Sequence, residues 1–485
     1  MQLEALLKAG EIASRPGCEA VHISGITADS RQVLPGFLFA ALPGTKADGS
    51  QFMSDAAAKG AAAIVAGPDA TVPPSLQIPV LRAREPRRAL ALMAAHYFGK
   101  QPATAVAVTG TSGKTSVAEF TRQIFEATGR KAASIGTIGV VKPGAAAYGS
   151  LTTPDPVTLH KTLAALADEG ITHLAFEASS HGLDQFRLDG VKLAAGAYTN
   201  LGRDHLDYHP TTEAYLAAKL RLFTELLEPG QPAVINMDGD RAADVARAAK
   251  ARGLELVTVG ETGETLKLAE RAAEGFAQRL TVQYRGQTYV IRLPLLGAYQ
   301  ASNALVAASL AIAAGEPAGL VLASLEALAG VKGRLEIVGE RNGALAAVDY
   351  AHKPEALAAV LDAVRPFATG KLICVFGCGG DRDRGKRPIM GEIAVQRADV
   401  TIVTDDNPRS ENPAAIRAEI LAAAPGAREI GDRAEAINAA VSMLAPGDVL
   451  IVAGKGHETG QIVGDRVIPF SDHDCLRRAL EADPK

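Results

Sequence analysis

Short apolar runs typical of buried strands alternate with helical patterns along the first hundred residues. VHISGITADSR, GFLFAALPG and GAAAIVAG have the composition of strands, and MSDAAAKGA between the last two is helical in pattern. The segment EPRRALALMAAHYFGKQPAT then connects these elements to a second α/β pattern. The pattern therefore predicts a small α/β domain over residues 1–100.

A second, larger α/β pattern begins at Ala103. The stretch AVAVTGTSGKTSVAEFTRQIFEATG is a buried strand, a glycine-rich turn and a helix, whose apolar positions are Val117, Phe120, Ile124 and Phe125. The strand-like runs THLAFEAS, GAYTNL and PAVINMDG alternate with helical stretches, as parallel βαβ units require. The segment Leu266 to Leu295 alternates in polarity instead and predicts an antiparallel hairpin that turns at Arg285 and Gly286. These elements predict a central domain over residues 101–333.

The alternation restarts after the stretch GVKGRLE. The runs KLICVFG, DVTIVTD and GDVLIVAG are each preceded by an alanine-rich helical pattern. This arrangement predicts a doubly wound, Rossmann-like domain over residues 334–485. The chain of 485 residues is long enough for three domains at roughly 150 residues each.

Composition and charge narrow the class of protein. The chain has 50 Lys and Arg against 54 Asp and Glu, a net charge of −4, and no basic tract, which argues against nucleic-acid binding. The longest apolar stretch, near Leu305 to Ala314, is too short to span a bilayer. The N-terminal residues do not resemble a signal peptide. Four cysteines are too few for a disulfide framework, and Cys374 and Cys378 fit core packing. We therefore expect a cytoplasmic protein without a membrane span.

A phosphate-binding loop is the strongest local motif. Its residues follow the strand at Ala103 and open the next helix, and they are Gly110, Thr111, Ser112, Gly113, Lys114, Thr115 and Ser116. Backbone N–H groups and the helix dipole at such a position favour phosphate oxygens, the lysine neutralises them and the threonine hydroxyl suits Mg²⁺. The loop is shorter than the common Walker A pattern by two residues. ATP is the expected nucleotide, although no motif rules out GTP.

Acidic and histidine residues follow two later strands of the same domain. Glu177 ends THLAFEAS, and His205 lies in TNLGRDHLDYH. The carboxyl ends of parallel strands are where such sheets bind ligands, and phosphoryl transfer needs a divalent metal held by hard donors. The alternative for the histidine segment is a solvated polar loop.

Ten motifs in order along the chain resemble those of the Mur ligase family. They are TGTSGKTS, FEASSHGLDQFR, TNLGRDHLDYH, YLAAKLRLF, GAYQASNALVAA, GVKGRLE, VDYAHKPEAL, GCGGDRDRGKRP, TDDNPR and AGKGHE. The resemblance implies an ATP-dependent ligase that forms an amide bond through an acyl phosphate in peptidoglycan precursor synthesis. It also implies a substrate-binding N-terminal domain, a central P-loop-type ATPase domain and a C-terminal domain that binds the amino acid.

By this resemblance, Lys114, Glu177, His205 and Lys219 are catalytic. Thr115, Glu177, His205 and a carbamate formed on Lys219 would hold Mg²⁺ ions. From the pattern alone, Lys219 is an ordinary helix lysine with its ammonium in solvent. The resemblance also implies that Asn303, Arg334 and Asp349 contact ATP, with His352 close by. From the sequence alone these positions read equally well as helix caps or hinge residues.

The resemblance assigns a second set of positions to the uridine nucleotide substrate. They are Ser30, Thr45, Lys46, Ala47, Thr152, Thr153, Ser179, Gln185 and Arg187. Hydroxyls and an arginine are suitable partners for a diphosphate and a carboxylate. Without the resemblance, the polar turns of the first domain would be surface loops.

A third set is implied for the incoming amino acid, and its members are Arg382, Asp406, Asn407, Pro408, Arg409, Gly454 and Glu458. The stretch DNPR points to family members that add meso-2,6-diaminopimelate to UDP-N-acetylmuramoyl-L-alanyl-D-glutamate, because Arg409 can pair bidentately with the extra carboxylate. Lysine addition, a folylpolyglutamate synthase and an ATP-dependent switch without ligation are the alternatives. We expect a monomer that binds only small-molecule substrates.

Overall fold

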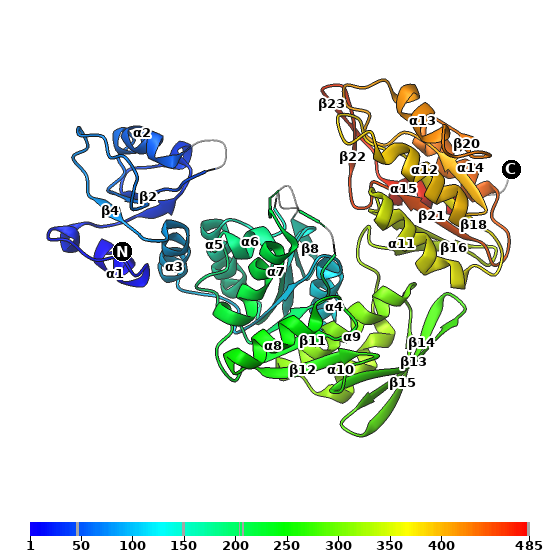
Figure 1. Cartoon of the computed structure of the whole chain (residues 1–485), viewed down its shortest axis with the longest axis horizontal. Helices are drawn as coiled ribbons and strands as arrows, with labels where there is room; N and C mark the ends of the chain where they lie inside the picture. The colour runs from blue at the N-terminus through cyan, green and yellow to red at the C-terminus, as the bar shows by residue number, and fades with distance from the viewer. Residues whose placement is uncertain (45–47, 148–150, 203, 206–207, 483–485) are drawn as a thin grey trace. The chain divides into compact units, whose positions relative to one another are not determined.

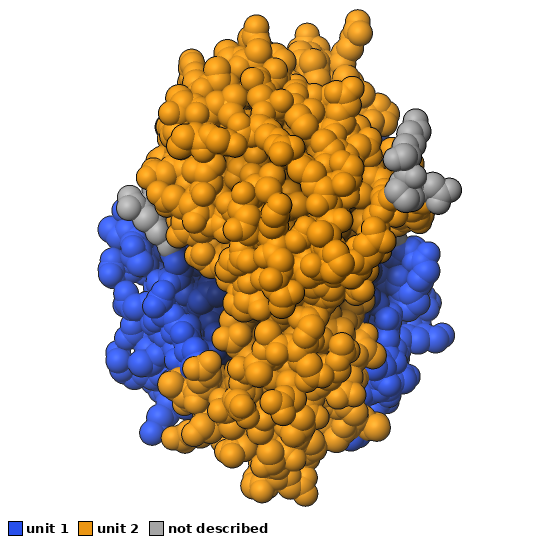
Figure 2. All heavy atoms as spheres, turned by 90° about the vertical axis from the view of Figure 1, so that its right-hand side faces the viewer, with its two compact units in different colours: residues 1–259, 309–317 blue, residues 260–308, 318–485 orange. Residues whose placement is uncertain are grey.

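The computed structural model describes residues 1–44, 48–147, 151–202, 204–205 and 208–482. The chain forms two compact units (Figure 2). Unit 1 comprises residues 1–259 and 309–317, and unit 2 comprises residues 260–308 and 318–485.

The N-terminal part of unit 1 is a four-stranded parallel sheet in the order β1-β2-β3-β4 (Figure 1). Its strands are β1 (Gly25–Thr27), β2 (Phe37–Ala41), β3 (Ala63–Ala66) and β4 (Val80–Arg82), and its helices are α1 (Leu3–Ala9), α2 (Met53–Ala58) and α3 (Pro86–Phe98). Alternate residues of β2 serve two cores. Leu38 packs with the core that includes residues of α1 and α3, and Phe39 packs with the core that includes residues of α2. The short apolar runs of the sequence are therefore buried strands covered on both faces.

A larger sheet of unit 1 has the order β12-β11-β10-β5-β9-β6-β7-β8. Its strands are β5 (Thr104–Thr109), β6 (Ala132–Gly136), β7 (Gly139–Lys142), β8 (Ala145–Ala147), β9 (His173–Glu177), β10 (Ala195–Tyr198), β11 (Pro232–Asn236) and β12 (Glu255–Gly260). The helices are α4 (Lys114–Ala127), α5 (Pro156–Asp168), α6 (Ser180–Asp184), α7 (Thr212–Arg221) and α8 (Ala242–Arg252). The six strands from β12 to β6 are parallel, and β7 and β8 continue antiparallel. The carboxyl ends of β5, β9 and β10 therefore meet at one edge.

Unit 2 begins with three antiparallel strands, β13 (Leu266–Glu274), β14 (Ala277–Tyr284) and β15 (Gln287–Leu293). They are followed by α9 (Ala298–Ala313), whose residues from 309 onward belong to unit 1, and by α10 (Ala318–Ser324). The predicted turn at Arg285 and Gly286 joins β14 to β15, and both residues have positive φ angles, as a tight hairpin turn requires. The predicted hairpin is confirmed, and it is extended by a third antiparallel strand. Gly275, also with positive φ, makes a second turn that the sequence reading missed.

The C-terminal sheet has the order β16-β17-β21-β18-β19-β20, with only β16 antiparallel. Its strands are β16 (Glu336–Arg341), β17 (Ala344–Asp349), β18 (Leu372–Phe376), β19 (Val400–Val403), β20 (Arg428–Glu429) and β21 (Val449–Ala453), and β22 (Gly460–Val463) and β23 (Arg466–Pro469) form a separate hairpin. The helices are α11 (Pro354–Val364), α12 (Lys386–Arg397), α13 (Pro413–Leu421), α14 (Arg433–Ser442) and α15 (Asp472–Glu481).

Both faces of this sheet are covered by helices (Figure 1). Alternate residues of β18 divide between two cores, since Cys374 packs with residues of α11, α12 and α13 whereas Ile373 packs with residues of α14 and α15. The prediction of an α/β protein with a doubly wound C-terminal part is confirmed. The domain boundaries after residues 100 and 333 stay predictions. No helix in the described ranges is long and apolar enough to cross a membrane.

Candidate active site

The glycine-rich loop 110–115 connects β5 to α4 and is braced by the residues that follow β10. Asn200 Oδ1 accepts a hydrogen bond from the backbone N–H of Ser112 at 2.9 Å, and Thr199 Oγ1 donates to the Ser112 carbonyl at 2.6 Å. Gly110 has φ +151°, and a Cβ there would lie 1.9 Å from Thr199 Oγ1. Close packing thus requires glycine at this turn. The bracing role of Thr199 and Asn200 was not predicted from the sequence, where both residues fall within the strand-like run GAYTNL and not after it.

The side chains of the loop gather at the N-terminus of α4. Lys114 Nζ donates to the carbonyl oxygens of Gly110 and Thr111, each at 2.9 Å. Thr115 and Ser116 are buried in the first turn of the helix. A helix N-terminus with an ammonium and hydroxyl groups beside it is suited to bind phosphate groups.

Glu177 ends β9 and lies beside Val108 of β5 in the parallel register. Its Oε1 accepts from the Thr137 N–H at 2.7 Å, and its Oε2 accepts from the Thr137 hydroxyl at 3.3 Å. A Cβ on Gly136 would lie 2.1 Å from Glu177 Oε1. The carboxylate is therefore buried in a fixed position near the phosphate loop, and neither Thr137 nor Gly136 was identified from sequence.

Lys219, on α7, is almost completely buried, with 1 % of its surface exposed. Its Nζ donates to the Gly110 carbonyl at 2.7 Å and lies 4.2 Å from the centre of the Tyr215 ring. Burial, and secondarily the nearby Lys114 ammonium, holds the pKa of Lys219 well below its usual range. The pattern-based reading of a lysine extending into solvent was therefore wrong, and the side chain points into the site.

His205 lies in the loop after β10, in a left-handed conformation with φ +54°. Its backbone N–H donates to Asp204 Oδ1 at 3.0 Å, and its ring packs edge-on to His181 with centroids 4.8 Å apart. Within the described ranges, no three side chains of His, Cys, Asp and Glu are grouped so that they could hold a metal. Thr115 and Glu177 fit Mg²⁺ as oxygen donors, because Mg²⁺ uses few protein ligands and completes its shell with water and phosphate oxygens.

Three residues predicted to contact ATP, Asn303, Arg334 and Asp349, lie in unit 2 and are joined by hydrogen bonds. Asn303 Nδ2 donates to Gln300 Oε1 at 3.1 Å, and Gln300 Nε2 donates to the Arg334 carbonyl at 3.0 Å. The N–H of Leu335, the next residue, donates to Asp349 Oδ2 at 2.6 Å. A continuous chain of hydrogen bonds thus links the three predicted positions.

Burial perturbs the titratable groups at the end of β17. It raises the pKa of Asp349 to about 6, against the opposing effect of the Arg334 guanidinium. Burial also lowers the pKa of His352, whose Nδ1 lies 2.8 Å from the Tyr350 carbonyl oxygen. Perturbed groups of this kind are common at functional sites.

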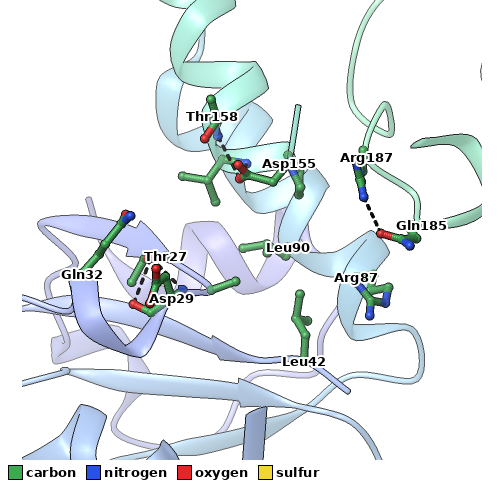
Figure 3. A pocket seen from close by; sticks show the side chains of 13 residues that line it. Thr27, Asp29, Gln32, Leu42, Arg87, Leu90, Asp155, Thr158, Gln185 and Arg187 are labelled. Atoms are coloured by element: carbon green, nitrogen blue, oxygen red, sulfur yellow. Dashed lines mark hydrogen bonds between the residues drawn. The ribbon is translucent and has the colours of Figure 1, made fainter. Parts of the chain in front are cut away.

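A cavity of about 340 Å³ lies within unit 1 between residues of the N-terminal part and the start of α5 (Figure 3). Gln185 and Arg187, two of the predicted substrate residues, line it together with Arg87 and Asp155. Arg187 donates to the Thr153 carbonyl at 2.7 Å and to Gln185 Oε1 at 2.8 Å. Burial lowers the pKa of Arg187, the charge of Asp155 opposes this effect, and the charge of Arg87 acts in the same direction as burial.

Three other predicted substrate residues, Thr152, Thr153 and Ser179, form hydrogen bonds near the end of β9, and Thr153 is joined to the cavity through Arg187. Thr153 Oγ1 donates to the Glu177 carbonyl at 2.8 Å and lies 2.9 Å from Ser179 Oγ, and Thr152 Oγ1 lies 3.1 Å from Thr137 Oγ1. Ser30 follows Asp29, which lines the cavity. The predicted positions Thr45, Lys46 and Ala47 lie outside the described residues.

Three loops that carry the predicted amino-acid residues leave neighbouring strands of the C-terminal sheet, β21, β18 and β19. Asn407 Nδ2 donates to Glu458 Oε2 at 2.9 Å, and Lys455 Nζ donates to both Asn407 Oδ1 at 3.0 Å and Glu458 Oε2 at 2.9 Å. Lys455 is fully buried. A Cβ on Gly454 would lie 2.7 Å from Asp406 Oδ2. Asn407 therefore joins two loops, and sequence reading did not identify the lysine that holds it.

The two predicted arginines of this site lie on adjoining loops. Arg409, after Pro408, has φ +50° and donates from Nη1 to the Gly380 carbonyl at 2.8 Å. Arg382 follows two residues after Gly380, and its guanidinium donates to the Asp381 carbonyl at 3.1 Å. Anionic and cationic groups thus alternate around the ends of these strands, as a zwitterionic amino-acid ligand requires.

Comparisons with known proteins agree with the motifs. The sequence matches the Mur ligase family catalytic domain over residues 22–98, the Mur ligase middle domain over 108–311 and the Mur ligase glutamate ligase domain over 333–456.

Two curated relatives and one solved structure are similar to this chain over nearly their whole length. Proteins named UDP-N-acetylmuramoyl-L-alanyl-D-glutamate--2,6-diaminopimelate ligase are 60 % identical in Bradyrhizobium diazoefficiens, with 99 % of each chain covered, and 62 % identical in Mesorhizobium japonicum, with 95 % of each covered. A solved structure of a ligase with this name is 31 % identical, has a TM-score of 0.76 and is matched over 98 % of each chain. The resemblance predicted from ten short motifs is confirmed, and the chain is an enzyme that belongs to the Mur ligase family.

Proposed function

We propose that the protein joins meso-2,6-diaminopimelate to UDP-N-acetylmuramoyl-L-alanyl-D-glutamate with hydrolysis of ATP to ADP and phosphate, in peptidoglycan precursor synthesis. The observation that carries this proposal is the guanidinium of Arg409, held by the carbonyl oxygens of Gly380 and Asn407 where three strand-end loops converge. The names of relatives at about 60 % identity support the same substrate pair.

The reaction needs activation because a carboxylate and an ammonium do not condense at neutral pH. The peptide carboxylate attacks the γ-phosphate of ATP, and ADP leaves as the acyl phosphate forms. Lys114 and the N–H groups at the start of α4 would neutralise the charge that develops on the phosphate oxygens. Mg²⁺, held by Thr115 and Glu177 with His205 near a second ion, would supply further charge neutralisation on these oxygens.

Lys219 is proposed to be carbamylated. A neutral lysine amine attacks CO₂, a C–N bond forms, and the proton is lost to solvent, which leaves an anionic carbamate. The low pKa of the buried Lys219 supplies the neutral amine that this step needs. The change would also place an anion beside the Lys114 ammonium, which forms an opposite-charge pair.

The second half of the reaction forms the amide bond. The free amine of diaminopimelate attacks the acyl carbon, a tetrahedral intermediate forms, and phosphate leaves with the proton passing to solvent. Arg409 and Arg382 would pair the carboxylates of the amino acid, and Asp406 and Glu458 would bind its distal ammonium. Positioning is the main contribution of these residues.

The nucleotide substrate is proposed to occupy the cavity in unit 1. Arg187 and Gln185 line it with their polar ends in the same corner (Figure 3). Ser30, Ser179, Thr152 and Thr153 are proposed to contact the same substrate. Arg87 adds a second cation to this cavity. All proposed binding residues belong to one chain, in keeping with a cytoplasmic monomer that uses soluble substrates.

One assay tests the proposal. The protein is incubated with the uridine nucleotide dipeptide, ATP and either diaminopimelate or lysine, and the product mass is measured with the phosphate released. We expect the mass of the diaminopimelate adduct and phosphate release only with all three substrates. Lysine incorporation at an equal rate would favour the lysine-adding alternative. Phosphate release without the other substrates would favour an ATP-dependent switch, and activity only with a folate substrate would favour a folylpolyglutamate synthase.

A further inference from the structure

Two loops of the C-terminal sheet, residues 377–385 after β18 and 404–411 after β19, are joined by several hydrogen bonds. The N–H of Gly380 donates to the Asn407 carbonyl at 2.9 Å, and Arg409 Nη1 donates back to the Gly380 carbonyl at 2.8 Å. The carboxylate of Asp381 accepts from the Ser410 N–H at 3.1 Å and from its hydroxyl at 2.6 Å. The loop that carries Arg382 is thus joined directly to the loop that carries Arg409.

The backbone of both loops adopts conformations that need support from their surroundings. Asp381 has φ +51° and Arg409 has φ +50°, a left-handed region that residues with side chains rarely occupy. The loops also approach closely, since a Cβ on Gly380 would lie 1.9 Å from the Pro408 carbonyl oxygen. Such conformations persist only where neighbouring contacts hold them, and they are frequent at functional sites.

Arg387, at the start of α12, stabilises this arrangement of the two loops. Its side chain has no exposed surface, and it pairs with both carboxylate oxygens of Glu411, Nη2 to Oε1 at 2.8 Å and Nη1 to Oε2 at 3.0 Å. Glu411 Oε1 also accepts the backbone N–H of Asp381 at 2.6 Å. The guanidinium pairs further with Glu419 of α13 at 2.8 Å. One buried cation therefore reaches the loops through Glu411 and the helix through Glu419.

Glu411 and Glu419 differ in the groups that they contact. Glu411 is part of the second loop and accepts from a backbone N–H of the first, whereas Glu419, on α13, pairs with Arg387 and with the largely exposed side chain of Arg384 in the first loop. Hydrogen bonding from Arg387 lowers the pKa of Glu411 to about 2, so this ion pair persists at neutral pH. A bidentate pair of this kind restricts geometry as well as adding attraction.

We infer that Arg387 and Glu411 are positioning residues for the incoming amino acid. They fix the two loops so that Arg382 and Arg409 present their guanidinium groups in one arrangement before the ligand binds. Neither residue is placed against the substrate, so they act through the loops. Preorganisation of this kind sets affinity for the amino acid rather than for ATP or the uridine nucleotide. The inference rests on the proposed function, since it assumes that the loops bind diaminopimelate.

The matched variants Glu411→Gln and Glu419→Gln test it, because each removes one negative charge from the same guanidinium with little change in shape. We expect Glu411→Gln to raise KM for diaminopimelate about tenfold, with kcat and KM for ATP nearly unchanged. Glu419→Gln should change these constants much less, because Glu419 reaches the first loop through the largely exposed side chain of Arg384 rather than through its backbone. Arg387→Lys should resemble Glu411→Gln, because an ammonium cannot reproduce the bidentate pair. Arg397→Ala changes a residue at the other end of α12 and is the control for general effects on this helix.

Hydrogen exchange of the free protein supplies a second readout that does not require turnover. Backbone amides of residues 380–382 and 408–411 should exchange faster in Glu411→Gln than in Glu419→Gln. Equal KM values for diaminopimelate in the two variants, or equal exchange of the loops, would overturn the inference. Failure of the wild-type protein to use diaminopimelate would instead overturn the proposed function, and the exchange comparison would still report on the loops.

Discussion

The side-chain nitrogen of Lys219 lies 2.7 Å from the backbone carbonyl oxygen of Gly110, although the two residues are 109 positions apart. Lys114 donates to the same oxygen at 2.9 Å. Two lysines thus donate to one carbonyl oxygen of the phosphate loop, and Lys219 is almost completely buried. Burial and the nearby Lys114 ammonium both disfavour the protonated form of Lys219, and the neutral amine can be converted into an anionic carbamate.

Replacement of Lys219 should abolish ligation while the fold is kept. Lys219→Met removes the amine and retains an apolar chain of similar length, so the buried site stays filled. We expect kcat to fall about 100-fold or more, because a group that orders charge near the phosphates is lost. Small carboxylic acids should restore part of the activity by supplying the missing anion. Turnover with and without formate or acetate is the measurement.

Lys250→Ala is the matched control, because it removes an exposed lysine of α8. It should leave kcat unchanged. A ¹³C carbamate signal should appear when the wild-type protein is equilibrated with ¹³C-labelled bicarbonate and should be missing in Lys219→Met. Full ligation activity in Lys219→Met would contradict the assignment.

Gly136 controls the position of Glu177 in unit 1. A Cβ at this position would lie 2.1 Å from Glu177 Oε1, so Gly136→Ala must displace the carboxylate. We expect kcat/KM to fall about tenfold or more and the Mg²⁺ concentration needed for half-maximal activity to rise, because a hard oxygen ligand is misplaced. Titration of activity with Mg²⁺ measures both effects. Gly67→Ala is the control, since its Cβ would meet nothing closer than 3.9 Å. A Mg²⁺ titration of Gly136→Ala that matches wild type would contradict the role given to Gly136.

Asp349 should make stability depend on pH. Burial raises its pKa to about 6 in the folded protein, from an ordinary value of 3.8. The folded state therefore holds a proton that the unfolded state releases between these values. Its stabilising contribution is complete below pH 3.8 and is lost as pH rises through 6, up to about 3 kcal/mol.

Asp349→Asn removes this titration and keeps an oxygen that can accept from the Leu335 N–H. The variant should therefore gain stability relative to wild type as pH rises from 4 to 7, which urea unfolding at several pH values measures. Asp465→Asn, which alters an exposed carboxylate in the β22–β23 turn, should show a much smaller change. A constant difference between Asp349→Asn and wild type over this range would mean that burial does not raise the pKa.

The strands and the motif loops were predictable because they depend on local patterns. A run such as LICVF is apolar at every position, which is typical of a strand covered on both faces, and β18 is such a strand. The loop after it then had to lie at a ligand-binding edge of the sheet. The second turn of the β13–β15 meander was missed because Gly275 lies within a long, mostly polar run with weak alternation.

Contacts between distant segments were not predictable from one sequence. The burial of Lys219 depends on the loop at Gly110, and the position of Asn407 depends on Lys455. No local periodicity distinguishes these buried lysines from exposed helix or loop lysines, because the partner that buries each one is far away in the chain. Recognition of the ten motifs identified Lys219 only through its likeness to family members, and it did not identify Lys455.

Arg409 should decide which amino acid is used. Its Nη1 is held by the Gly380 carbonyl at 2.8 Å, which orients the planar guanidinium, and a lysine ammonium cannot pair with a carboxylate in the same bidentate way. Arg409→Lys should therefore lower kcat/KM for diaminopimelate about 100-fold, and Arg409→Ala should lower it further, since the distal carboxylate would be left unpaired. The affinity for ATP, measured by calorimetry, should stay unchanged. Arg466→Ala removes an exposed arginine of β23 and is the control. Diaminopimelate ligation at the wild-type rate by Arg409→Ala would show that another group recognises this carboxylate.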